Sequence, residues 1–124
     1  NLVSNVGVVS TDVTGVGTGR QDLGACSFGG DQGIFGYGFT NVDPYNLNIS
    51  NLVSNVGVVS TDATGVGTIR SDLSACEFGG DKGIFGFGTP DKSMTNLVSN
   101  VGIVATDTTG VGTGRTATCA CSYN

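Results

Sequence analysis

One stretch of sequence occurs three times in this chain, and it constrains the fold more than any other feature. Residues 51–88 read NLVSNVGVVSTDATGVGTIRSDLSACEFGGDKGIFGFG, and residues 1–38 are nearly identical. A shorter third copy, NLVSNVGIVATDTTGVGTGRTATCACSYN, fills residues 96–124. Repetition at a period of about 20–50 residues is typical of repeat architectures, whose units need neighbours to bury their apolar faces.

The copies divide the chain into residues 1–50, 51–95 and 96–124, the last of them truncated. Together they make part of one repeat domain. Because the sequence begins at a copy boundary and ends inside a copy, we expect it to belong to a longer array. The segments that differ between copies, residues 39–50 and 89–95, differ in length as well, so we expect them to be surface loops.

Each full copy predicts four short strands and no helix. In the second copy they are residues 52–60, 65–69, 72–78 and 82–89, which are rich in valine or partly alternate in polarity. Gly79-Gly80-Asp81 separates the last two strands, and a short Gly- and Asp-rich link of this kind indicates a hairpin. The predicted fold is therefore all-β, with tandem four-stranded antiparallel repeats.

Composition excludes several functions. The chain has no histidine, which removes Ser-His-Asp and Cys-His catalysis and imidazole metal sites. Its net charge of -5 argues against a nucleic-acid partner, since binding phosphates needs clustered Lys and Arg. No apolar run approaches the length of a membrane span. We therefore expect no enzyme activity, no cofactor, no bound metal and no membrane insertion.

Two motifs resemble the repeats of kelch-like β-propellers. The first is Gly-Arg, at Gly19-Arg20 and Gly114-Arg115, followed by a strand of small residues. The second is Gly-Gly-Asp-x-Gly-Ile-Phe-Gly-Tyr/Phe-Gly. The repeated wording NLVSNVG…GGDKGIFGFG is also similar to repeats in structural proteins of marine bacterial viruses, especially tail and fibre proteins. The resemblance covers nearly the whole chain apart from the two variable segments.

The resemblance implies that the repeats are kelch-like propeller blades; a β-rich fibre or a stacked-sheet repeat is the alternative. A propeller takes about four to eight blades, which is more than these copies supply. Exposed valine-rich strand edges also tend to recruit another chain. We therefore expect the chain to assemble with other copies or with other virion proteins, and not to exist as a free folded monomer.

Arginine and aspartate recur at matched positions of the copies. An anion-binding ring of arginines is one interpretation. The favoured interpretation is structural: each guanidinium bonds backbone carbonyls or an aspartate, as its planar fork allows. These structural repeat positions are Arg20, Arg70, Arg115, Asp12, Asp62 and Asp107.

Cysteine also recurs, at Cys26, Cys76 and Cys121. Equivalent positions of successive blades lie too far apart for a disulfide, so we expect these thiols to be unpaired and buried. Asp31 and Asp81 lie in the Gly-Gly-Asp motif, where a hairpin turn is favoured over a calcium site because each loop offers one carboxylate.

The resemblance to tail and fibre repeats implies a structural or adhesion module of the virion, assembled in the host cytoplasm and then extracellular. A rigid scaffold would present its variable loops to a virion protein, or to a glycan or protein of the host surface. A cellular kelch-type interaction adaptor is the alternative. The loop residues predicted to make such contacts are Asn41, Asp43, Tyr45, Asn46, Asp91 and Lys92.

Overall fold

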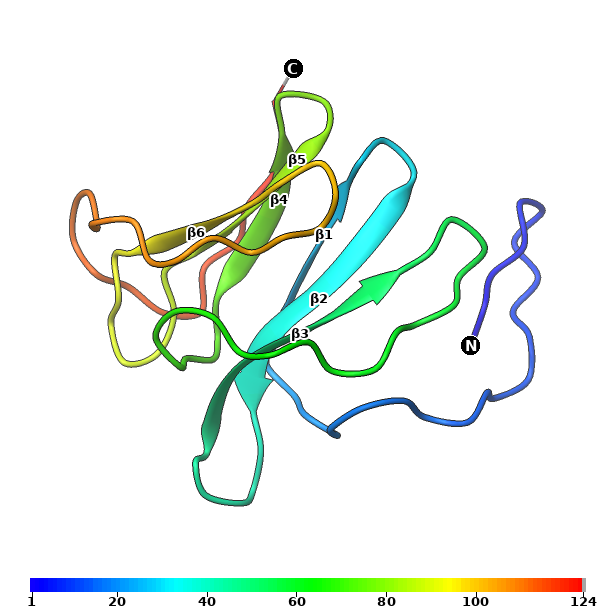
Figure 1. The fold of residues 1–124 in the computed structure, drawn as a ribbon, viewed down its shortest axis with the longest axis horizontal. Helices are drawn as coiled ribbons and strands as arrows, with labels where there is room; N and C mark the ends of the chain where they lie inside the picture. The colour runs from blue at the N-terminus through cyan, green and yellow to red at the C-terminus, as the bar shows by residue number, and fades with distance from the viewer. Residues whose placement is uncertain (124) are drawn as a thin grey trace.

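The computed structural model describes residues 1–123, and these residues form strands, turns and irregular segments without a helix (Figure 1). The predicted all-β class is confirmed. The strands of the described residues are β1 (Gly24–Phe28), β2 (Gln32–Phe39), β3 (Asn46–Val53), β4 (Ser74–Phe78), β5 (Lys82–Gly86) and β6 (Thr95–Val98).

The strands form two antiparallel sheets, a first sheet in the order β1-β2-β3 and a second sheet in the order β4-β5-β6. A tight turn joins the first two strands of each sheet, and Gly29 and Gly79 both turn there with φ of 62°. Glycine adopts this left-handed conformation without steric cost. The hairpin predicted at Gly79-Gly80-Asp81 is therefore confirmed.

The two sheets pack face to face through the ring of Phe85 on β5. A side chain at Gly36 would start 2.6 Å from Phe85 Cζ, and one at Gly24 would start 3.1 Å from Phe85 Cδ1. These two glycines make room for the ring, which has no exposed surface. Burying a phenylalanine stabilises a fold by about 1.5–3 kcal/mol. The buried apolar core consists of Phe28, Ile34, Tyr37, Leu73, Phe85 and Val98.

Each sheet has three strands where four were predicted. The predicted strand over residues 52–60 stops at Val53, and a turn follows. In that turn Ser54 N donates to the Val58 carbonyl at 2.9 Å, and Val58 N donates to Ser54 Oγ at 3.0 Å. Val56 and Val58 are exposed. The valine-rich pattern was misread because a serine side chain closes the turn, which leaves the valines facing outward.

The predicted strand over residues 65–69 is irregular as well. Thr68 N donates to the Asp107 carboxylate at 3.0 Å, so a side chain takes the place of a neighbouring strand. The segments 39–50 and 89–95, predicted as loops, are partly strand, because β3 begins at Asn46 and β6 at Thr95. In both cases the loop prediction was too long.

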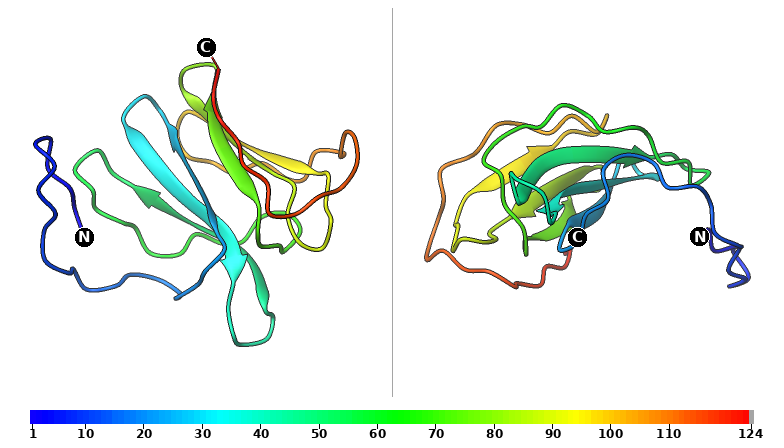
Figure 2. Two further views of the ribbon diagram at one scale, coloured as in Figure 1. Left: turned by 180° about the vertical axis from the view of Figure 1, so that it is seen from behind. Right: turned by 90° about the horizontal axis from the view of Figure 1, so that it is seen from below.

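The two ends of the described chain lie outside the sheets. Residues 1–16, which we call the N-terminal arm, repeat the serine turn: Ser4 N donates to the Val8 carbonyl at 2.9 Å. They are exposed throughout (blue in Figure 1). Residues 115–123, the C-terminal arm, run alongside the second sheet (red in Figure 2). Residues 1–123 close no barrel or ring.

Candidate functional site

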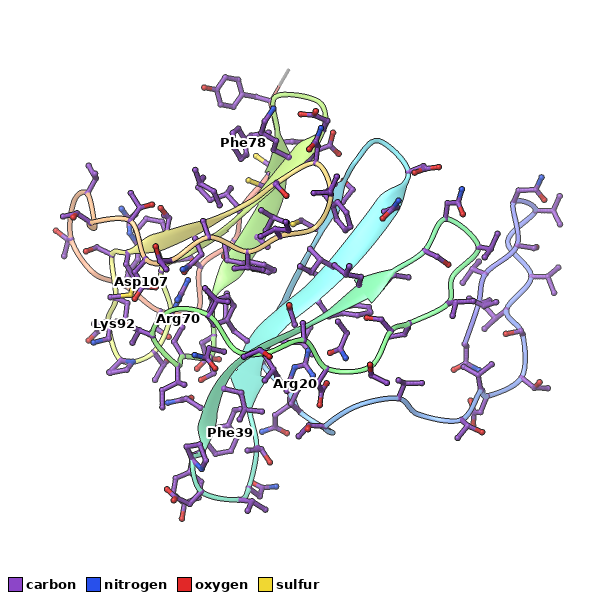
Figure 3. The ribbon with its side chains drawn as sticks, viewed as in Figure 1. Arg20, Phe39, Arg70, Phe78, Lys92 and Asp107 are labelled. Atoms are coloured by element: carbon purple, nitrogen blue, oxygen red, sulfur yellow. The ribbon has the colours of Figure 1, made fainter. Side chains whose placement is uncertain are left out.

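A buried arginine ties together the strands of the second sheet. Arg70 Nε donates to the Phe87 carbonyl at 2.9 Å, and its Nη2 donates to Asn96 Oδ1 at 2.6 Å. Its Nη1 donates to the Thr68 carbonyl at 3.2 Å and lies 3.9 Å from Asp107 Oδ1 (Figure 3). The planar guanidinium therefore links the ends of three chain segments at once.

Arg20 makes the same contacts in the first sheet. Its Nε donates to the Tyr37 carbonyl at 2.7 Å, its Nη2 donates to Asn51 Oδ1 at 2.6 Å, and its Nη1 lies 3.8 Å from Asp62 Oδ1. Both guanidinium groups thus donate their hydrogen bonds to other residues of the chain. This geometry favours the structural interpretation of the two arginines over an anion-binding ring.

The outer members of the series are only partly matched. Asp12 accepts a hydrogen bond from Asn1 Nδ2 at 2.8 Å, and no arginine in residues 1–123 forms an ion pair with it. The guanidinium of Arg115 stacks over the Phe87 ring at 4.6 Å from its centroid. Within the described residues the Arg115 side chain makes no ion pair.

The electrostatics of the two clusters shift the pKa values of their groups, and desolvation lowers the pKa of Arg20 against the opposing charge of Asp62. Desolvation raises the pKa of Asp107, but hydrogen bonds from Thr68 and Asn96 and the charge of Arg70 outweigh it and hold the pKa below its usual value. The pKa of Asp62 is lowered by the equivalent balance. Burial raises the pKa of Tyr37 to about 12. General acid–base catalysis needs the opposite, a group with a pKa near the working pH.

An apolar cleft of ≈ 500 Å³ opens beside Arg20, between the first sheet and the N-terminal arm. Phe35 lies in it and is 37% exposed, whereas its counterpart Phe85 in the second sheet is fully buried. On the second sheet, the equivalent face is covered by the first sheet. The cleft therefore lies on the same face of the first sheet, which is only partly covered. Its other apolar lining residues are Leu2, Val13, Val16, Leu23, Val58 and Val59.

A projecting hairpin carries most of the loop residues predicted to make contacts. The connection between β2 and β3 extends away from both sheets (Figure 1), with Phe39 at its base (Figure 3). Phe39 and Tyr45 stack with centroids 6.1 Å apart and an interplanar angle of 15°. Tyr45 is 56% exposed and Val42 70% exposed. The predicted candidates on this hairpin are Asn41, Asp43, Tyr45 and Asn46, the last being the first residue of β3.

The other two candidates lie in a more confined loop. Lys92 N donates to the Gly88 carbonyl at 2.8 Å, and the Lys92 carbonyl accepts from Arg115 N at 3.2 Å. A side chain at Gly114 would collide with the Asp91 carbonyl. The C-terminal arm thus packs on this loop, and the structure does not bring Asp91 and Lys92 together with the projecting hairpin.

The repeated cysteines line one groove, which also contains the β1, β4 and C-terminal-arm backbones. All four thiols of the chain are free, as predicted for the repeated ones. The repeated thiols are less buried than predicted, because Cys26 and Cys76 are half-buried and Cys121 is exposed; Cys119 is exposed as well. Burial raises the pKa of Cys26 to about 11, so this thiol is a poor nucleophile.

The acidic turn residues build no metal site. Asp31 accepts a hydrogen bond from Asn55 Nδ2 at 2.9 Å, and Asp81 pairs with Lys82 Nζ at 2.7 Å. In residues 1–123 no three His, Cys, Asp or Glu side chains gather as metal ligands do. None of these residues belongs to a helix long and apolar enough to cross a lipid bilayer.

Sequence reasoning missed the asparagine of each arginine cluster. Asn51 and Asn96 both accept from an arginine and donate to an aspartate, at 2.8 Å and 2.9 Å. The signal was present, because an asparagine opens every copy of the repeat. No known protein family matches this chain, and no curated protein does so either.

Proposed function

We propose that the chain is a non-enzymatic structural or adhesion module in which stacked repeat units hold out a hairpin for contact with another molecule. The observation that carries this proposal is the projecting hairpin between β2 and β3. The matching connection in the second sheet, residues 87–94, is contacted by the C-terminal arm, whereas the tip of this hairpin exposes Val42 and Tyr45. Exposed tyrosines offer large rigid contact areas and are enriched at interfaces.

The stacking of the sheets supports a scaffold built from propeller-like blades. The units pack face to face through a phenylalanine ring against Gly24 and Gly36, and the second sheet repeats one of these glycines at Gly86 and has Ser74 in place of the other. The arginine clusters stiffen each unit from within. We therefore propose that the two sheets are blades of a larger arrangement, which other units complete.

The resemblance of the repeats to those of viral tails and fibres suggests the setting and the partner. In a virion, the hairpin would contact a neighbouring virion protein or a glycan of the host surface. Tyr45 would supply an aromatic face for a sugar ring, with Asn41 and Asp43 beside it as hydrogen-bonding groups.

The test is a binding screen of the chain against an array of bacterial surface oligosaccharides. Binding should be lost in Tyr45→Ala and kept in Val111→Ala, which removes an exposed valine far along the sequence. Both variants should melt like the parent chain. Binding that survives Tyr45→Ala, or that is absent from the parent, would remove the glycan form of the proposal; a pull-down with other virion proteins then tests the protein form.

A further inference from the structure

The C-terminal arm follows the same path as β1 and β4, the first strands of the two sheets. Gly88 N donates to the Arg115 carbonyl at 3.0 Å, as Gly38 N donates to the Arg70 carbonyl at 3.1 Å. Ala117 has φ of 50°, which equals that of Asp72 at the matched position. The arm therefore occupies the place of the first strand of a further unit.

Hydrogen bonds fix the arm in that place. Ala117 N donates to the Asp72 carbonyl at 3.1 Å, as Asp72 N donates to the Asp22 carbonyl at 2.9 Å. Ser74 Oγ donates to the Thr118 carbonyl. The arm thus sits on the second sheet as the second sheet sits on the first.

The strand that should pair with this arm is missing from the described residues. β1 pairs with β2 and β4 pairs with β5, whereas residues 119–123 pair with no strand in residues 1–123 and are exposed. An unpaired edge presents a row of backbone donors and acceptors, which an added extended segment can satisfy.

A glycine that matches Gly36 lies beside the unpaired edge. At Gly36 the space above the strand is filled by the ring of Phe85. At Gly86, the matched position of the second sheet, a side chain would meet only Thr95 Cγ2, at 3.4 Å. Within residues 1–123 no ring occupies this position in the second sheet, where Gly86 is buried and Ser74 takes the place of Gly24.

The Arg115 guanidinium also lies at this position, and its Nε has no hydrogen-bond acceptor within residues 1–123. Arg70 stacks over Tyr37 at 4.1 Å and donates from Nε to the Phe87 carbonyl of its own unit. Arg115 makes the matching stack over Phe87, and within the described residues its Nε has no acceptor. The missing acceptor would be the carbonyl of an aromatic residue two places after the phenylalanine of the absent strand.

We propose that this site binds an extended segment of the type Gly-Asp-x-Gly-Ile-Phe-Gly-Tyr/Phe, supplied by a further repeat unit. The segment would add antiparallel to residues 119–123. By the register of β1 on β2, Ala120 would face the phenylalanine and Cys121 the isoleucine. This inference rests on the proposed function, for it names the partner through which the scaffold extends.

The experiment uses a fluorescent peptide of residues 29–39, GGDQGIFGYGF, titrated with the full chain and followed by anisotropy. We expect saturable binding of one peptide per chain. Replacing the peptide phenylalanine that corresponds to Phe35 by alanine should weaken binding at least about tenfold, because the buried ring is lost. Absence of saturable binding by the parent chain would overturn the proposal.

Two chain variants locate the site. Gly86→Val places a branched side chain at the position that matches Gly36 and should also weaken binding at least about tenfold, while Gly19→Val, at a glycine with nothing nearby, should not change it. Circular dichroism and a thermal melt establish that both variants fold. Binding that is indifferent to Gly86→Val would mean that the peptide has exchanged with β2 or joined another edge, and the proposal would be wrong.

Disulfide cross-linking tests the register of the peptide on residues 119–123 directly. A peptide carrying an activated mixed disulfide at the isoleucine position should be attacked by the Cys121 thiolate, which displaces the small thiol and forms the cross-link. Trapping at Cys119 or Cys26 instead would contradict the register. These outcomes are independent of the oligosaccharide screen, because the peptide site and the projecting hairpin lie on different segments.

Discussion

Replacing Arg70 by methionine removes the guanidinium and keeps much of the apolar stem. The variant leaves Asn96 Oδ1 and the Phe87 carbonyl without their donor, and Asn96 has no exposed surface. An orphaned buried acceptor costs about 1–3 kcal/mol, and the stack on the Tyr37 ring is lost as well. We expect the free energy of unfolding to fall by about 3–5 kcal/mol in total.

The matched control is Arg115→Met. Within residues 1–123 the exposed Arg115 side chain has only the stack over Phe87, so we expect its removal to lower the free energy of unfolding by about 0.5–1 kcal/mol. Urea unfolding of both variants, followed by circular dichroism, measures the difference. The two curves should have the parent slope and well-separated midpoints. Equal midpoints for the two variants would refute the assignment of a structural role to the buried cluster.

Three further outcomes are expected. Gly36→Val should destabilise the chain by about 1–3 kcal/mol in thermal or urea unfolding, because the new side chain meets the Phe85 ring; a neutral result would contradict the sheet stacking. Alkylation by iodoacetamide at pH 8 should modify Cys119 long before Cys26, whose pKa of about 11 keeps it protonated, and mass spectrometry of the peptides measures the order. The pKa of Asp107 is lower in the folded chain than its ordinary 3.8, so the unfolded chain binds more protons and the free energy of unfolding falls as the pH drops below about 3.8. Asp107→Asn should make this pH dependence shallower in a series of urea unfolding curves. An unchanged pH dependence would contradict the assignment.

The parts of the fold that could be predicted from the sequence depend on local chemistry. The Gly-Gly-Asp turn needs glycine at positive φ, so the residues themselves specify the hairpin. The recurrence of arginine and aspartate at matched positions indicated an ion pair, and Arg20 lies 3.8 Å from Asp62 as Arg70 lies 3.9 Å from Asp107. Hydrophobic runs were less informative. Val56 and Val58 belong to a turn that the Ser54 side chain closes, and a pattern of apolar residues does not take such a hydrogen bond into account.

Contacts between units could not be predicted from one copy of the repeat. Gly36 reads as a weak position in a strand, and only the stacked sheet shows that it receives the ring of Phe85. The role of Asn96 depends likewise on an arginine many residues earlier in the chain. The strand content of residues 46–50 was missed because a sequence that differs between copies was equated with a loop.

The phenylalanine and the glycine of the sheet contact lie next to each other on one strand, as Phe35 and Gly36 on β2. Both complete units therefore carry a phenylalanine and the glycine next to it, on β2 and on β5. In an array of such units, gain or loss of one whole unit would leave each ring between two units matched to a glycine, whereas loss of half a unit would leave a ring without its glycine. The number of units in such an array can vary in whole steps without any redesign of its packing.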